Sequence, residues 1–83
     1  MTRDAIRAAV VDALSSVAPE IDPSSLNPDD EFRQVFELDS MDFLNFVVAL
    51  HARLAVDVPE ADYPRLVSLN KAVDYLAERL RTS

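Results

Sequence analysis

The sequence predicts an all-α protein, a four-helix bundle with three main helices and one short third helix. Three observations lead to this prediction. Apolar residues recur at helical spacings of three and four along three segments, prolines and other turn-forming residues separate these segments, and the one strand-like run, residues 56–58, has no second strand to pair with. A chain of 83 residues can build one hydrophobic core, so residues 1–83 are expected to form a single domain.

The first helix is expected to begin after Thr2, a suitable N-cap, and to run to about Ala18. Its apolar positions at helical spacing are Ile6, Ala9, Val10, Ala13, Leu14 and Val17. Pro19 disfavours helix at the residue before it, and Pro, Ser and Asn then cluster as far as Pro28. This pattern predicts a long loop, which three apolar residues are expected to hold against the core: Ile21, Leu26 and Phe32.

The second main helix is expected from Ser40 to about Leu54, and both Asp39 and Ser40 are suited to cap it. At about 100° per residue, five apolar residues share one sector roughly 100° wide and form the expected core stripe. They are Phe43, Phe46, Val47, Leu50 and Leu54.

The remaining chain is expected to form a weak third helix and a strong last one. Residues 59–63 could make one or two helical turns before Pro64 interrupts them. Ser68 is expected to cap the last helix, with Arg79 and Arg81 near its negative end. The apolar residues of this helix are Leu69, Ala72, Val73, Leu76 and Leu80.

All the excess charge of the chain lies in one segment. Residues 20–42 contain eight acids and one base, Arg33, and their sum of −7 equals the net charge of the whole chain. Such a segment repels nucleic acid and attracts a basic protein partner. The alternative is that these acids are solvated loop residues that serve solubility only.

The composition argues against an enzyme. There is no cysteine to act as a nucleophile or zinc ligand, and no glycine for a phosphate-binding loop. Ser40 and the only histidine, His51, would lie roughly 16 Å apart along one helix, too far for a catalytic pair. The acids lie in a loop without an apolar pocket that would raise the pKa of one carboxyl above another, so paired-carboxylate catalysis is not expected. The loop also lacks the glycine and ligand spacing of an EF-hand, so no metal is expected, and His51 is interpreted as a surface residue.

Ser40 is the residue whose position suggests covalent chemistry. A helix N-terminus favours an anion, because its amides lack intrahelical partners and the helix dipole is positive there. From local chemistry alone, two roles stay open for Ser40: it caps the helix, or it bears a phosphodiester.

A resemblance to a known family bears on this choice. Residues 32–42, with the triplet Asp39-Ser40-Met41, resemble the phosphopantetheine attachment region of acyl carrier proteins, in which Asp-Ser-Leu or Asp-Ser-Met heads the second helix. Residues 56–59 are similar to the turn that follows that helix in the family, and residues 72–76 resemble its last helix. The resemblance therefore covers nearly the whole chain.

The resemblance implies a carrier that serves as a substrate of enzymes. A phosphopantetheinyl transferase would move 4'-phosphopantetheine from coenzyme A to Ser40, and the thiol of this arm would hold an acyl cargo as a thioester. By family position, Asp39 would help the transferase to recognise the site. Further partners would be acyl- or aminoacyl-loading and acyl-transferring enzymes. We expect a cytoplasmic monomer that does not insert into membranes.

The sequence departs from the family in two places, and the second departure favours a specialised pathway. Glu37 and Leu38 stand where the family usually has a glycine before the serine, so the turn must form without glycine. The second helix of fatty-acid carriers is typically rich in acids, whereas Asp42 is the only acid here. An aminoacyl or peptidyl carrier, of the D-alanine or nonribosomal type, is therefore an alternative. An unmodified helical adaptor is another.

The second main helix has more apolar residues than one core stripe needs. Met41, Leu44 and Val48 fall on a second stripe that runs beside Ser40. With Asp42 at the edge, they are expected to contact partner enzymes. Alternatively, the third helix or the long loop covers them and they belong to the core.

Overall fold

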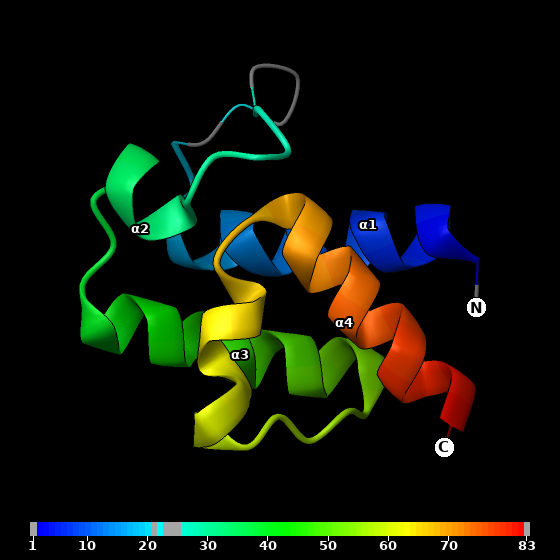
Figure 1. Ribbon diagram of the computed structural model, residues 1–83. Helices are drawn as coiled ribbons and strands as arrows, with labels where there is room; N and C mark the ends of the chain where they lie inside the picture. Colours follow the sequence, from blue (N-terminus) through cyan, green and yellow to red (C-terminus); the bar gives the residue numbers. More distant parts are fainter. Residues whose placement is uncertain (1, 21, 23–25, 83) are drawn as a thin grey trace.

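The computed structural model describes the chain except for residues 1, 21, 23–25 and 83. The described part is helical and contains no strand, which confirms the predicted all-α class. Its elements are α1 (Arg3–Val17), α2 (Phe32–Val35), α3 (Ser40–Leu54), the 3-10 helix η2 (Glu60–Leu66) and α4 (Leu69–Thr82). Helix α1 packs against α3 and α4, and η2 packs against α4 (Figure 1). In the described residues no helix has the length and apolar character needed to cross a membrane.

Helix α1 follows the predicted pattern closely. The hydroxyl oxygen of Thr2 accepts a hydrogen bond from the Ala5 amide at 3.1 Å, so Thr2 is the N-cap. The helix ends one residue before Ala18, whose methyl group is buried. Four of the predicted apolar residues are buried in the core: Ile6, Val10, Ala13 and Leu14.

Helix α2 is a single turn inside the segment that the sequence predicts as a loop. A helix this short is not stable by propensity, so tertiary contacts must stabilise it. Phe32 is fully buried, and its amide donates to the Val67 carbonyl oxygen at 2.8 Å. Leu26 is partly buried against the core, so the expected anchoring by Leu26 and Phe32 is confirmed. Ile21 lies outside the described residues.

Helix α3 has the predicted bounds and the predicted core stripe. All five stripe residues are buried: Phe43, Phe46, Val47, Leu50 and Leu54. The C-cap is Ala55, which adopts the left-handed conformation with φ 55° and donates its amide to the His51 carbonyl oxygen at 2.8 Å. The side chain of His51 is exposed, as predicted, and its Nδ1 lies 3.2 Å from the Val56 carbonyl oxygen.

The third helix is longer than predicted, and Pro64 does not interrupt it. The 3-10 helix η2 continues through Pro64 to Leu66, because proline's fixed φ suits a 3-10 turn and tertiary contacts stabilise the segment. Leu66 is fully buried, and Tyr63 packs against the core. The interruption expected at Pro64 follows the rule for α-helix interiors, which does not govern this short 3-10 helix.

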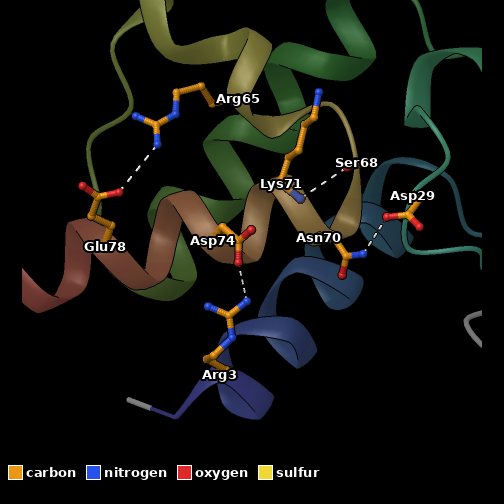
Figure 2. Close-up of polar contacts among 8 residues, drawn as sticks. All are labelled: Arg3, Asp29, Arg65, Ser68, Asn70, Lys71, Asp74 and Glu78. Atoms are coloured by element: carbon orange, nitrogen blue, oxygen red, sulfur yellow. Dashed lines mark hydrogen bonds and ion pairs between the residues drawn. The ribbon is translucent and has the colours of Figure 1, made fainter.

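Helix α4 is capped as predicted, since the Ser68 hydroxyl accepts from the Lys71 amide at 3.3 Å (Figure 2). The figure also shows the Arg3 guanidinium paired with Asp74 of α4. Asn70 donates to Asp29 of the long loop at 2.7 Å. The exposed contacts of Arg3 and Asn70 add little stability individually. The larger contribution comes from the predicted apolar stripe of α4, which packs into the core. Its buried residues are Leu69, Ala72, Val73 and Leu76, and Leu80 is partly buried.

A buried tyrosine joins η2 to α4. The Tyr75 hydroxyl donates to a carboxylate oxygen of Asp62 at 2.6 Å, and the Arg65 guanidinium lies 4.8 Å from the centre of the tyrosine ring. Burial raises the pKa of Tyr75, and its hydrogen bond to Asp62 raises that pKa further. The tyrosine is therefore held in its neutral form.

This pKa shift predicts a loss of stability at high pH. Because the folded-state pKa of Tyr75 lies above its unfolded value, its contribution to stability is complete below about pH 10 and is lost as the pH rises through the folded pKa. We expect the unfolding free energy, measured by urea titration, to fall above about pH 10. In Tyr75→Phe the part of this fall that Tyr75 causes should vanish. The unfolding free energy near neutral pH should decrease by about 1–2 kcal/mol, because the hydrogen bond to Asp62 is lost. Tyr63→Phe, the control, should keep the fall.

Candidate functional site

Ser40 is the first residue of α3, and its neighbours cap the helix. A side-chain oxygen of Asp39 accepts from the Asp42 amide at 2.8 Å, and a side-chain oxygen of Asp42 accepts from the Asp39 amide at 3.4 Å. Asp39 is therefore the N-cap, although the sequence allowed either residue. The exposed Ser40 hydroxyl is left available for another role.

The turn before Ser40 is left-handed at Glu37, which has φ 53°. Glycine tolerates this conformation without cost, whereas an ordinary residue in it is destabilised by roughly 1 kcal/mol. The structure thus forms the expected glycine-free turn by placing a glutamate in the glycine conformation. The next residue, Leu38, is buried and anchors the turn to the core.

The two left-handed residues predict stabilising substitutions. Glu37→Gly and Ala55→Gly should each raise the unfolding free energy by about 0.5–1 kcal/mol, because the relieved backbone cost exceeds the added entropy of the unfolded chain. The expected rise in Tm is about 2–8 °C. Ala52→Gly, at an exposed position inside α3, should instead lower stability by about 1 kcal/mol. Urea unfolding of the three variants tests the contrast.

Arg33, from α2, is the polar neighbour of Ser40. Its Nη2 donates to the Ser40 hydroxyl oxygen at 3.4 Å, and its Nε donates to the Leu38 carbonyl oxygen, also at 3.4 Å. The guanidinium carbon lies 6.0 Å from the centre of the Phe43 ring. In the sequence, Arg33 stands out only as the one base of the acidic segment, and its place beside Ser40 is evident only in the fold.

A pocket of about 340 Å³ opens beside Ser40 between α2, α3 and η2. The aromatic rings of Phe43 and Tyr63 meet edge to face in its wall, with their centres 5.7 Å apart. Its lining residues are Arg33, Ser40, Phe43, Leu44, Glu60 and Tyr63. Glu60 and Tyr63 were not identified from the sequence, because only the folding of η2 against α3 brings them to Ser40.

The second apolar stripe of α3 is exposed. Met41 is 64% exposed, Leu44 42% and Val48 58%, so the alternative that they are covered core residues is wrong. Asp42, expected at the edge of this stripe, is partly buried. Val35 of α2 is also 49% exposed, a feature that the sequence did not single out.

The chemistry around Ser40 fits a bound phosphate group. The first amides of α3 have no intrahelical acceptors, and the helix dipole and the Arg33 guanidinium both favour an anion at this position. His51 cannot act as a base for Ser40, because it lies on the same helix about 16 Å along its axis. Among the described residues, no cluster of three or more His, Cys, Asp or Glu side chains could hold a metal ion.

Comparison with known proteins agrees with this chemistry. The family model described as phosphopantetheine attachment site matches residues 5–76, which span α1 to α4 and include Ser40. An acyl carrier protein of Rubrobacter xylanophilus is 28% identical over 58 residues, which are 70% of this chain and 72% of that protein. Acyl carrier protein 2 of Pseudomonas aeruginosa is 29% identical over 62 residues, covering 75% of this chain and 78% of the relative.

A mitochondrial relative covers more of this chain but extends beyond it. Acyl carrier protein 2 of Arabidopsis thaliana, a mitochondrial protein, is 30% identical over 74 residues, which are 86% of this chain and 59% of that protein. The family model, the exposed serine at the start of α3 and these relatives lead to one conclusion: the chain belongs to the acyl carrier protein family, whose members carry a covalent 4'-phosphopantetheine cofactor.

Proposed function

We propose that Ser40 is the residue that bears 4'-phosphopantetheine, and that the thiol of this arm carries an acyl group as a thioester in a specialised pathway. The observation that supports Ser40 most is its placement: an exposed hydroxyl on the first residue of α3, beside Arg33 and a pocket. The cofactor supplies the thiol that this cysteine-free chain lacks. The residues of the chain supply the attachment point and its anion-favouring surroundings.

The same proposal covers how the protein works with others. The chain acts as a single carrier domain, a monomer in the cytoplasm, and is a substrate and not a catalyst. A phosphopantetheinyl transferase loads Ser40 and uses Asp39 for recognition, and acyl- or aminoacyl-loading and acyl-transferring enzymes then act on the arm. The family match supports the assignment of catalysis to these partners, because the relatives named above are acyl carrier proteins.

Partner enzymes dock on the exposed stripe of α3, namely Met41, Leu44 and Val48, with Asp42 at its edge. Two features support this surface. It lies on the helix that begins at Ser40, and its exposed apolar groups next to a charged residue match the usual arrangement of an interface centre and a polar rim. A partner that covers the stripe would be in reach of the arm.

The attachment site can be tested by mass. The purified chain is incubated with a phosphopantetheinyl transferase and coenzyme A, and its intact mass should rise by one phosphopantetheine group. Trypsin cleaves after Arg33 and Arg53, and the peptide of residues 34–53 contains Ser40 as its only hydroxyl-bearing residue. The added mass should therefore be found on this peptide. A wild-type chain that stays unmodified with several transferases would contradict the proposal and favour the unmodified adaptor.

An aminoacyl or peptidyl carrier is the second candidate. It is favoured by the charge of α3, in which Asp42 is the only acid and Arg53 adds a positive charge. Mass spectrometry of the native protein with its cargo attached distinguishes the two. An amine-containing cargo supports the second candidate, and a fatty or other acyl group supports the first.

The acidic segment predicts a salt-dependent association. Because the excess charge of −7 lies in residues 20–42, the on-rate of a basic transferase should fall as salt rises. Asp39→Asn with Asp42→Asn should weaken this dependence while retaining the capping groups, since Asn caps about as well as Asp. The control, Asp4→Asn with Asp12→Asn, removes two charges from α1 and should change the salt dependence of the on-rate less. A flat on-rate in stopped-flow measurements would show that the acids serve solubility only.

A further inference from the structure

Arg33 occupies an unusual electrostatic position. It is the only base among the nine charged residues of the acidic segment, and its guanidinium lies next to the hydroxyl of Ser40. Three acidic side chains belong to the same region: Asp39 and Asp42 cap the start of α3, and Glu60 lines the same pocket. These carboxylates repel a further negative charge at Ser40 and oppose the attraction of the helix N-terminus, and the Arg33 guanidinium offsets their repulsion.

The guanidinium is already oriented in the unmodified protein. Arg33 follows Phe32, whose fully buried ring fixes α2 on the core. Its Nε is bonded to the Leu38 carbonyl oxygen, and its guanidinium faces the Phe43 ring. Arginine has five N–H donors, so donors remain for another acceptor beyond the 3.4 Å contact with the hydroxyl of Ser40.

We propose that Arg33 binds the phosphodiester of the arm and so offsets the charge that the modification adds. The inference rests on the attachment to Ser40 proposed above. Guanidinium groups bind phosphate oxygens with paired, charge-assisted hydrogen bonds. Because the Arg33 side chain is already oriented, binding the phosphate costs little conformational entropy. Arg33 is thus a cofactor-binding residue, and its effect should appear only when the phosphate is present.

A comparison of modified and unmodified protein tests this directly. The Tm of both forms is measured for wild type, Arg33→Gln, Arg33→Lys and Arg53→Gln. The Tm of the modified protein minus the Tm of the unmodified protein should be about 2–6 °C lower in Arg33→Gln than in wild type. Arg33→Lys keeps the charge but loses the paired geometry, so its Tm difference should lie between those of wild type and Arg33→Gln.

Arg53→Gln is a matched control. Arg53 is also an exposed arginine with a 3.4 Å hydrogen bond to a backbone carbonyl, that of Ala49, but it lies near the opposite end of α3. Arg53→Gln should therefore leave the Tm difference between modified and unmodified protein unchanged. A purely structural role for Arg33 would lower the Tm of both forms equally and would also leave the difference unchanged.

Magnetic resonance gives a readout that does not depend on stability. The phosphorus resonance of the modified protein should shift in Arg33→Gln and not in Arg53→Gln. In wild type, the Nε–H resonance of Arg33 should move between the unmodified and modified forms, a comparison that needs no variant. If the transferase does not accept Arg33→Gln, this wild-type comparison decides.

The outcomes separate this inference from the proposed function. An unchanged Tm difference in Arg33→Gln, or an Arg33 resonance that does not move on modification, overturns the inference while the attachment to Ser40 stands. A wild-type chain that gains no mass on the peptide of residues 34–53 overturns the attachment itself, and the inference with it.

Discussion

Ser40→Ala is expected to abolish phosphopantetheine attachment completely and to leave the unfolding free energy within about 0.5 kcal/mol of wild type. The attachment is lost because the hydroxyl that bears the arm is removed. The fold is retained because Asp39, not Ser40, caps α3, and because the hydroxyl contributes only an exposed 3.4 Å contact with Arg33. Alanine also favours the helix at this position.

Intact mass and urea unfolding, measured on the same samples, test both halves of this expectation. Ser16→Ala is the matched control: Ser16 is exposed on α1, and its hydroxyl donates to the Ala13 carbonyl oxygen at 2.6 Å. This variant should be modified like wild type. Asp39→Ala should instead lose about 1 kcal/mol of stability, because it removes the cap. If Ser40→Ala still gains the mass of the arm, another residue bears it and the assignment is wrong.

Val48→Glu is expected to slow the modification of Ser40 by about tenfold or more while changing stability by no more than about 0.5 kcal/mol. Val48 is 58% exposed, so a glutamate there remains in water in the free protein. In a complex with the transferase, the same carboxylate would be buried against an apolar contact surface. The loss should therefore appear in kcat/KM for the transferase and not in the unfolding midpoint.

Two variants separate the lost contact from the added charge. Val48→Gln introduces polarity without charge and should also slow the reaction, by a smaller factor. Ala8→Glu adds the same charge to an exposed position of α1 and should leave the rate nearly unchanged. A large loss of stability in Val48→Glu, with the folded fraction modified at the wild-type rate, would refute the docking surface.

The candidate site could be predicted from the sequence only where local rules govern it. Ser40 at the start of a helix follows from the apolar period and the capping residues, and the second stripe follows from the excess of apolar residues on the same helix. Only the structure shows that this second stripe is exposed. Arg33 and Tyr63 could not be placed at Ser40 in this way. They lie 7 and 23 positions away in the sequence, and the buried side chains of α2 and η2 bring them there.

By itself, the sequence determined the three main helices, their buried faces, the position of Ser40 and the concentration of charge before it. Periodicity, capping and net charge are local properties that survive in any arrangement of the helices. The tertiary structure alone decided that Phe32 stabilises a one-turn helix, that η2 continues through Pro64 and that Glu37 adopts the left-handed turn. In each of these three cases contacts with the core offset an unfavourable local conformation, and such contacts exist only once the helices have packed together.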